Sequence, residues 1–171
     1  MALTLVATPG SANANSYETL SEANAFLATQ LNTFAWDDAI EDAQIQALIM
    51  ATRLMDTLIQ WHGSPTTSTQ ALAWPMLGQE DAFGRTISSS IVPAIIKQAE
   101  SLYALLLLQD PGDVVEREDI KELAVGEGSI RVVYRTSGPV SPLLSLPGQI
   151  RQMVSAYGTL SGTWTTSLRR V

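Results

Sequence analysis

Apolar side chains recur at intervals of three and four residues in three long stretches of the chain, the spacing of helices that bury one face. The first predicted helix opens at Thr19, where Thr-Leu-Ser-Glu forms a capping box with Glu22 as its third helical residue. It runs to about Leu31. We expect Ala23, Phe26, Leu27 and Leu31 on its buried face.

Two further helices are predicted from the same spacing. One begins at Asp37 and ends at Gly63, and it is apolar over most of its circumference, which indicates a central position. The other follows Pro93, a residue favoured at the first helical position, and stops at Asp110. The core is expected around apolar residues of these two helices: Leu48, Leu54, Ile95, Leu102 and Leu106.

The rest of the chain shows shorter patterns. Residues 119–136 carry apolar side chains on both sides of Gly126-Glu127-Gly128, which predicts a β-hairpin. Residues 2–6 indicate a short strand or extended arm, and Pro147 is expected to open a short helix over 147–157. Residues 160–171 show no periodicity, so we expect a tail that folds only against a partner.

Together these elements predict a mainly α fold: a small helical bundle with a β-hairpin, an extended N-terminal arm and a C-terminal tail. The 171 residues suffice for one domain. We expect a single domain over 1–171, divided into an N-terminal arm and loop (1–16), a helical core (17–112), the hairpin (113–138) and the short helix and tail (139–171).

A long irregular stretch over residues 64–90 separates the second and third helices. Loops of this length are usually functional or disordered. This one contains Leu72 and the dipeptide Trp74-Pro75, which favour burial. We therefore expect it to be pinned to the core.

Charge is distributed unevenly along the chain, whose net charge is −7 with 10 basic and 17 acidic residues. Residues 1–52 hold no Lys or Arg, whereas 128–171 hold no acid and five arginines. Either these are solvated surfaces, or the two ends suit heterologous, head-to-tail contacts. A general nucleic-acid binder would normally be basic, because neutralising phosphates supplies most of the affinity.

Candidate catalytic and metal-binding groups are few. The chain has no cysteine and one histidine, His62, which we expect to meet carbonyls at a helix C-terminus. The acids at 37–42 and 116–119 are expected to be solvated, because they lack the partners of an acid–base or calcium site. We therefore predict no catalytic, cofactor or metal residue and no enzymatic activity. The longest apolar run, 102–108, is too short to span a membrane, and no signal peptide is visible, so a soluble intracellular protein is expected.

Four tryptophans could stack on nucleic-acid bases, but such platforms usually include a basic groove. Trp36, Trp61 and Trp74 are expected to be core or interface anchors instead. Trp164 lies in the acid-free tail beside arginines, a combination typical of interface hot spots. We expect the tail to dock on a partner.

Five segments, in their order along the chain, resemble one protein family. They are residues 16–24, 51–56, 70–75, 91–99 with the leucine-rich helix, and 125–134. In order and spacing they resemble the head-to-tail adaptor, or connector, proteins of tailed bacteriophages, a group often labelled "DnaT-like". The resemblance covers about residues 14–136 and consists of packing and turn residues.

The resemblance implies a structural virion protein. It implies a homo-oligomeric ring of twelve copies in the phage neck, bound to the portal protein on one side and to a tail-completion or tail protein on the other. Double-stranded DNA would pass through the ring during packaging and ejection. The ring would assemble in the host cytoplasm, with no cofactor and no membrane.

Site residues follow from this resemblance. The tail is expected to dock on the portal through Trp164, Leu168, Arg169, Arg170 and Val171, and subunits are expected to meet at Leu3, Leu5, Arg131, Val133 and Arg135. The alternative is a DnaT-like primosomal replication protein that binds single-stranded DNA. The negative net charge and the lack of a basic aromatic groove argue against that alternative, and a salt-dependent oligonucleotide-binding assay distinguishes the two.

Overall fold

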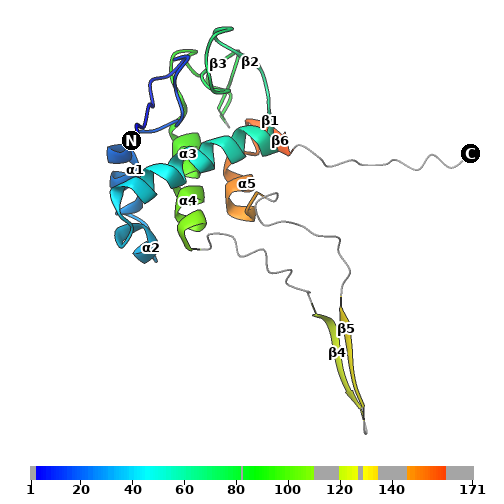
Figure 1. The fold of residues 1–171 in the computed structure, drawn as a ribbon. Coiled ribbons are helices and arrows are strands. Elements are labelled where there is room, and N and C mark those ends of the chain that lie inside the picture. The colour runs from blue at the N-terminus through cyan, green and yellow to red at the C-terminus, as the bar shows by residue number, and fades with distance from the viewer. Residues whose placement is uncertain (1–2, 82, 110–119, 127–128, 135–145, 161–171) are drawn as a thin grey trace, which may run out of the picture.

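A computed structural model describes residues 3–81, 83–109, 120–126, 129–134 and 146–160, and it confirms the mainly helical fold with little β structure (Figure 1). Its elements are α1 (Leu20–Leu27), α2 (Phe34–Asp37), α3 (Glu41–Leu58), β1 (Ile59–Trp61), β2 (Ser64–Pro65), β3 (Met76–Leu77), α4 (Ala94–Gln109), β4 (Ile120–Gly126), β5 (Ser129–Tyr134), α5 (Gly148–Val154) and β6 (Gly158–Leu160).

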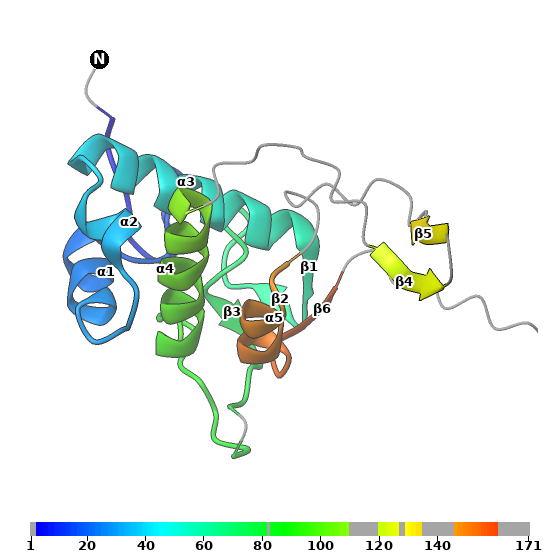
Figure 2. The ribbon, with the colours of Figure 1, turned by 90° about the horizontal axis from the view of Figure 1, so that it is seen from below.

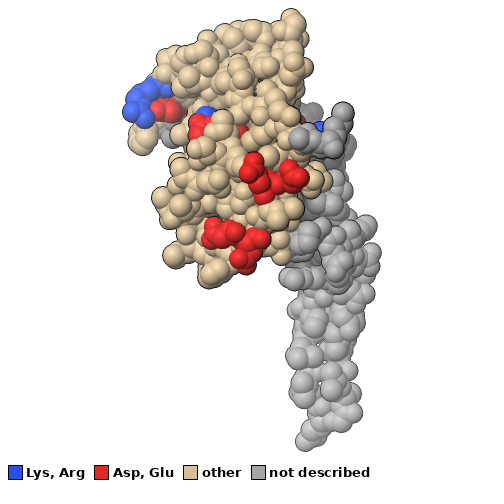
Figure 3. Space-filling view, turned by 60° about the vertical axis from the view of Figure 1, so that its left-hand side comes forward, with Lys and Arg blue, Asp and Glu red and all other residues tan. Residues whose placement is uncertain are grey.

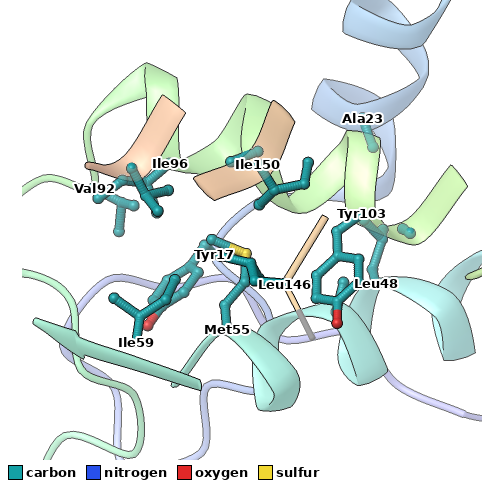
Figure 4. Close-up of a cluster of buried hydrophobic side chains, with 14 of the residues drawn as sticks. Tyr17, Ala23, Leu48, Met55, Ile59, Val92, Ile96, Tyr103, Leu146 and Ile150 are labelled. Atoms are coloured by element: carbon teal, nitrogen blue, oxygen red, sulfur yellow. The ribbon is translucent and has the colours of Figure 1, made fainter. Parts of the chain in front are cut away.

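The two long helices α3 and α4 pack against each other at the centre of the helical core. Figures 1 and 2 show α4 crossing α3, with α1 and α2 on one side of α4 and α5 on the other. The hydrophobic core lies between these helices and contains side chains such as Tyr17, Met55, Ile96 and Ile150 (Figure 4). The predicted core residues are confirmed: Leu48 is fully buried, and Leu54, Ile95, Leu102 and Leu106 are partly buried against it.

Local sequence signals place several elements correctly. Thr19 and Glu22 form the predicted capping box, in which each side chain accepts from the other residue's backbone N–H. The predicted hairpin is present as β4 and β5, with Ile120 opposite Tyr134 and Val125 opposite Ile130. α4 begins directly after Pro93.

The first helix ends at Leu27, four residues before the predicted end. Its last turn tightens, because Thr29 and Gln30 donate to carbonyls only three residues back. Asn32 then takes a left-handed φ of 61°, a conformation that breaks a right-handed helix. Leu31, predicted as the end of the helix, is 88% exposed.

The second predicted helix is shorter than its expected span from Asp37 to Gly63, because α3 begins only at Glu41. Residues 34–37 form the separate helix α2, and α3 ends at Leu58, because the next three residues pair antiparallel with β6. Gly158 allows this pairing, since an added Cβ would lie 2.5 Å from Ile59 Cγ2. The same pairing ends α5 at Val154, short of the predicted 157, and places Leu160 in a strand where a tail was predicted.

The N-terminal arm is extended but is not a β-strand. Asn15 holds it: its Oδ1 accepts from the N–H of Val6 at 2.7 Å, and its Nδ2 donates to the carbonyl of Thr4 at 2.9 Å. Leu5 packs partly buried against the protein's own core, while Leu3 is 38% exposed. The arm therefore belongs to the same packed unit as the helices.

Two buried carboxyl groups join the segment before α1 to the central helices. Glu100, on α4, is 0% exposed; it accepts from Ser16 Oγ at 2.7 Å and from the N–H of Tyr17 at 3.0 Å, and Thr52 Oγ1 of α3 reaches the same group. Glu18 is 2% exposed and accepts from the hydroxyl of Ser101. One network thus connects three parts of the chain.

Burial keeps these two groups protonated. Burial raises the pKa of Glu18 to about 8; the hydrogen bond from Ser101 opposes this rise, the charge of Glu22 adds to it and Lys97 lowers it. Lys97 is itself paired with Glu22 at 2.6 Å. The pKa of Glu100 is raised well above its ordinary value, first by burial and then by the charge of Glu18. Both groups are therefore largely neutral at pH 7.

The free energy of unfolding is expected to fall as pH rises from about 5 to about 8. In this window the native state retains the protons of Glu18 and Glu100, whereas the unfolded chain, with carboxyl pKa values near 4.5, releases them. The contribution is fully present below pH 4.5 and is lost as pH rises through the native pKa. Glu18 alone accounts for an effect on the order of 3–5 kcal/mol.

Glu18→Gln tests this, because glutamine keeps an acceptor for Ser101 and cannot ionise. Denaturant titrations at several pH values should show a flatter dependence for this variant than for the wild type. Glu41→Gln, an exposed position at the start of α3, is the matched control and should leave the profile unchanged. Identical profiles for Glu18→Gln and the wild type would contradict the assignment.

Candidate functional site

An exposed aromatic ring stands at the tip of a turn between β3 and α4. Residues 79–81 run against 85–87: the N–H of Ile87 donates to Gln79 O, and the N–H of Asp81 donates to Arg85 O, both at 2.9 Å. Phe83 lies between them and is 84% exposed. We call residues 79–81 and 83–87 the Phe83 turn.

Asp81 fixes the conformation of this turn. Its Oδ1 accepts from the N–H groups of Phe83 and Arg85, each at 2.9 Å, and its Oδ2 lies 2.6 Å from Arg85 Nε. The N–H of Arg85, followed by the Arg85 side chain, holds the pKa of Asp81 below its usual value. Gly84 takes a φ of +75°, which strongly favours glycine. The aromatic ring is thus presented on an ordered backbone.

A cation lies on this ring. The Arg85 guanidinium carbon is 5.3 Å from the centroid of Phe83, within the range of a cation–π contact. The Arg85 side chain is 75% exposed. A flat ring and a guanidinium side by side in solvent are the groups that stack on bases and contact phosphates.

The base of the turn is locked to β1. Gln79 is buried, and its Nε2 donates to the carbonyl of His62. Gly63 makes this approach possible, because it has a φ of +99° and an added Cβ would lie 2.1 Å from Gln79 Nε2. The strand pair β2–β3, in which Pro65 pairs with Met76, closes the same loop.

An aromatic cluster connects the loop to the core, confirming the prediction that it is pinned. Trp74 is 1% exposed and packs edge-on against Trp61 and Tyr157, with centroids 6.0 and 5.8 Å away. Asp56, on α3, accepts from Trp61 Nε1 at 2.8 Å and from the N–H of Ala73 at 3.1 Å. Burial raises the pKa of Asp56 and that of Tyr157, and Asp81 raises the latter further.

The buried tryptophans match the sequence prediction of core anchors, since Trp36 is 2% exposed and donates from Nε1 to Asn24 Oδ1 at 2.8 Å. His62 differs from its prediction. It follows β1, not a helix, because α3 ends at Leu58; its N–H donates to Tyr157 O at 2.8 Å.

The acidic residues around α2 and the start of α3 are exposed, as predicted for solvated side chains. On the face seen in Figure 3, acidic side chains gather in separate patches and basic side chains are sparse. Phe34, the first residue of α2, is 75% exposed; Asp37 and Asp38 follow it in the sequence, and no arginine lies near it in the sequence. No cluster of His, Cys, Asp or Glu among the described residues could hold a metal ion.

Most of the predicted site residues lie outside the described residues. These are Arg135, Trp164, Leu168, Arg169, Arg170 and Val171. Arg131 and Val133 lie in β5, where they pair in register with Ala124 and Glu122. Leu3 and Leu5 lie in the N-terminal arm. The roles of all these residues remain predictions.

Phe83 and Arg85 are not among the residues predicted from the sequence, where only tryptophans are candidate stacking residues. A signal is nevertheless present: Asp81 and Gly84 are turn-forming residues, and they bracket an aromatic residue that has no apolar periodicity around it.

The chain matches the model of the family described as "Putative DnaT-like ssDNA binding protein" over residues 1–171. No curated protein and no solved structure matches it. In the described part of the chain, no helix is long and apolar enough to cross a membrane.

The family match corrects the connector interpretation. A twelve-copy ring in the phage neck, a virion location, portal and tail partners and the passage of double-stranded DNA are all overturned by a match to a family of single-stranded-DNA-binding proteins. The alternative stated from the sequence is the better supported one. The error arose because packing and turn residues, such as the capping box and the buried Trp74-Pro75, specify a fold and not a ligand.

Asp81→Ala is expected to loosen the Phe83 turn while leaving the fold intact. The N–H groups of Phe83 and Arg85 lose their acceptor, so their amide hydrogen exchange should accelerate, whereas the free energy of unfolding should stay close to that of the wild type. Asp38→Ala, at another exposed aspartate, serves as the control and should alter neither amide. Unchanged exchange in Asp81→Ala would show that the side chain does not hold the turn.

Proposed function

The chain belongs to the DnaT-like family, and we propose that it binds single-stranded DNA as a non-enzymatic replication protein. The family match over all 171 residues carries this proposal. The family is described by binding and not by a catalytic activity, which agrees with the absence of a catalytic constellation in the sequence.

The negative net charge does not prevent such binding, because charge acts locally. The screening length is about 8 Å at physiological salt, so a phosphate responds to the charges beside it and not to the sum over the chain. Residues 128–171 contain no acid and five arginines: Arg131, Arg135, Arg151, Arg169 and Arg170. This segment is the natural phosphate-binding part of the chain.

The buried carboxyl groups reduce the opposing charge further. Glu18 and Glu100 count as two of the seventeen acids in the formal charge, yet both are largely protonated at neutral pH. The repulsion that a DNA strand meets is therefore smaller than the sequence total implies.

Binding is expected to be salt-dependent and to require the arginines of the C-terminal segment. Fluorescence anisotropy with a labelled oligo-dT should show affinity falling as salt rises, with about 0.7 units of log–log slope for each neutralised phosphate. Arg169→Ala combined with Arg170→Ala should weaken binding several-fold and lower the slope by roughly 1.4.

Arg53→Ala is the matched control, because Arg53 is an exposed arginine on α3 outside the acid-free segment. It should leave both affinity and slope unchanged. Failure of the wild-type chain to bind oligo-dT at low salt would refute the proposed function, as would stronger binding to a duplex of equal length.

A further inference from the structure

We propose that the Phe83 turn is a base-stacking site, in which an unpaired base lies on the ring of Phe83 and Arg85 contacts a neighbouring phosphate. This inference rests on the proposed function and adds the residues that would distinguish single-stranded DNA from other polyanions. A nucleotide presents a flat apolar base and an anion a few bonds apart. The turn presents a flat ring and a cation 5.3 Å apart.

The exposure of Phe83 is the first support. A large apolar side chain is 84% exposed although the chain has an extensive core in which to bury such groups. The ring is also held in place, because the backbone on both sides is bonded to Asp81. Since an ordered ring loses little conformational freedom when a base stacks on it, the turn is pre-organised for binding.

The state of Arg85 is the second support. Its Nε is committed to Asp81, and within the described residues no hydrogen bond is recorded for its two terminal amino groups. These two groups can donate to a phosphate while the Nε–Asp81 pair holds the guanidinium near the ring. The arginine therefore both orients Phe83 and offers donors to the backbone of the DNA.

Phe34 is a second exposed phenylalanine, and comparing it with Phe83 shows what the neighbouring charges contribute. It is 75% exposed, but it precedes Asp37 and Asp38, and the side chain of Asp37 is bonded to Thr33. Carboxylates at this position repel phosphates. Two phenylalanines are thus comparably exposed, and one of them has a guanidinium beside it.

Charge at the Phe83 turn predicts a specific thermodynamic signature. Asp81 and Arg85 neutralise each other, and Glu80 adds one exposed negative charge, so any attraction of the turn for DNA comes from stacking and not from phosphate neutralisation. Loss of the ring should therefore weaken binding without changing its salt dependence. The salt dependence of binding thus distinguishes the two sites, because removing arginines from residues 128–171 should lower the log–log salt slope and removing the Phe83 ring should not.

The experiment compares Phe83→Ala, Phe83→Trp and Phe34→Ala in the full chain, with oligo-dT and with an abasic strand of equal length as probes. Phe83→Ala should weaken binding to oligo-dT by about 5- to 100-fold, at an unchanged salt slope, and leave binding to the abasic strand unaltered. Phe83→Trp should restore affinity. Phe34→Ala should behave as the wild type.

The outcomes separate this inference from the proposed function. If the wild type binds oligo-dT and Phe83→Ala binds equally well, stacking on the turn is refuted while the function stands. Equal losses on the base-bearing and abasic strands would also refute it, because the ring would then act without contacting bases. If the wild type binds no single-stranded DNA, both fail. Thermal unfolding of each variant checks folding, which the exposed position of Phe83 should preserve.

Discussion

The hydrogen-bond network around the buried carboxyl group of Glu100 joins the segment before α1 to the two central helices. The hydroxyls of Ser16 and Thr52 both reach Glu100, yet each also lies against a backbone carbonyl, that of Glu18 at 2.7 Å and that of Leu48 at 3.0 Å. Each hydroxyl has a single proton and can donate it to the backbone carbonyl or to Glu100, but not fully to both. A protonated Glu100 can itself donate a hydrogen bond and so satisfy a contact that the hydroxyls leave without a proton. Because an unpaired buried charge is very costly, the neutral form is the one that lets the segment before α1 pack on α3 and α4.

The helical core also holds the non-helical loop between β1 and α4 in place. Asp56 extends from α3 to the Trp61–Trp74 pair, and Gln79 binds the carbonyl that follows β1. Each contact ties the loop after β1 to an element whose position is already fixed by packing. These buried polar and aromatic contacts therefore fix the base of the loop that carries the exposed ring of Phe83.

Sequence patterns predicted those parts of the fold that depend on neighbouring residues. The capping box at Thr19, the periodic helix after Pro93 and the hairpin around residues 119–136 all follow from local spacing. The β1–β6 pairing joins residues about a hundred positions apart, and local spacing in the sequence does not reveal such a contact. The predicted helix was therefore extended past Leu58, where the chain instead forms β1. The candidate site was missed for a related reason: exposure of Phe83 is decided by the turn around it, and function by chemistry that packing motifs do not report.

The short β1–β6 ladder also determines where the end of the chain begins. Leu160, the last described residue, pairs with Ile59, and β1 leads directly to His62 and the base of the Phe83 turn. The eleven residues that follow Leu160 can extend at most about 40 Å from this anchor. If the chain binds single-stranded DNA as proposed, this anchor limits how far the arginines after Leu160 can lie from the base of the Phe83 turn.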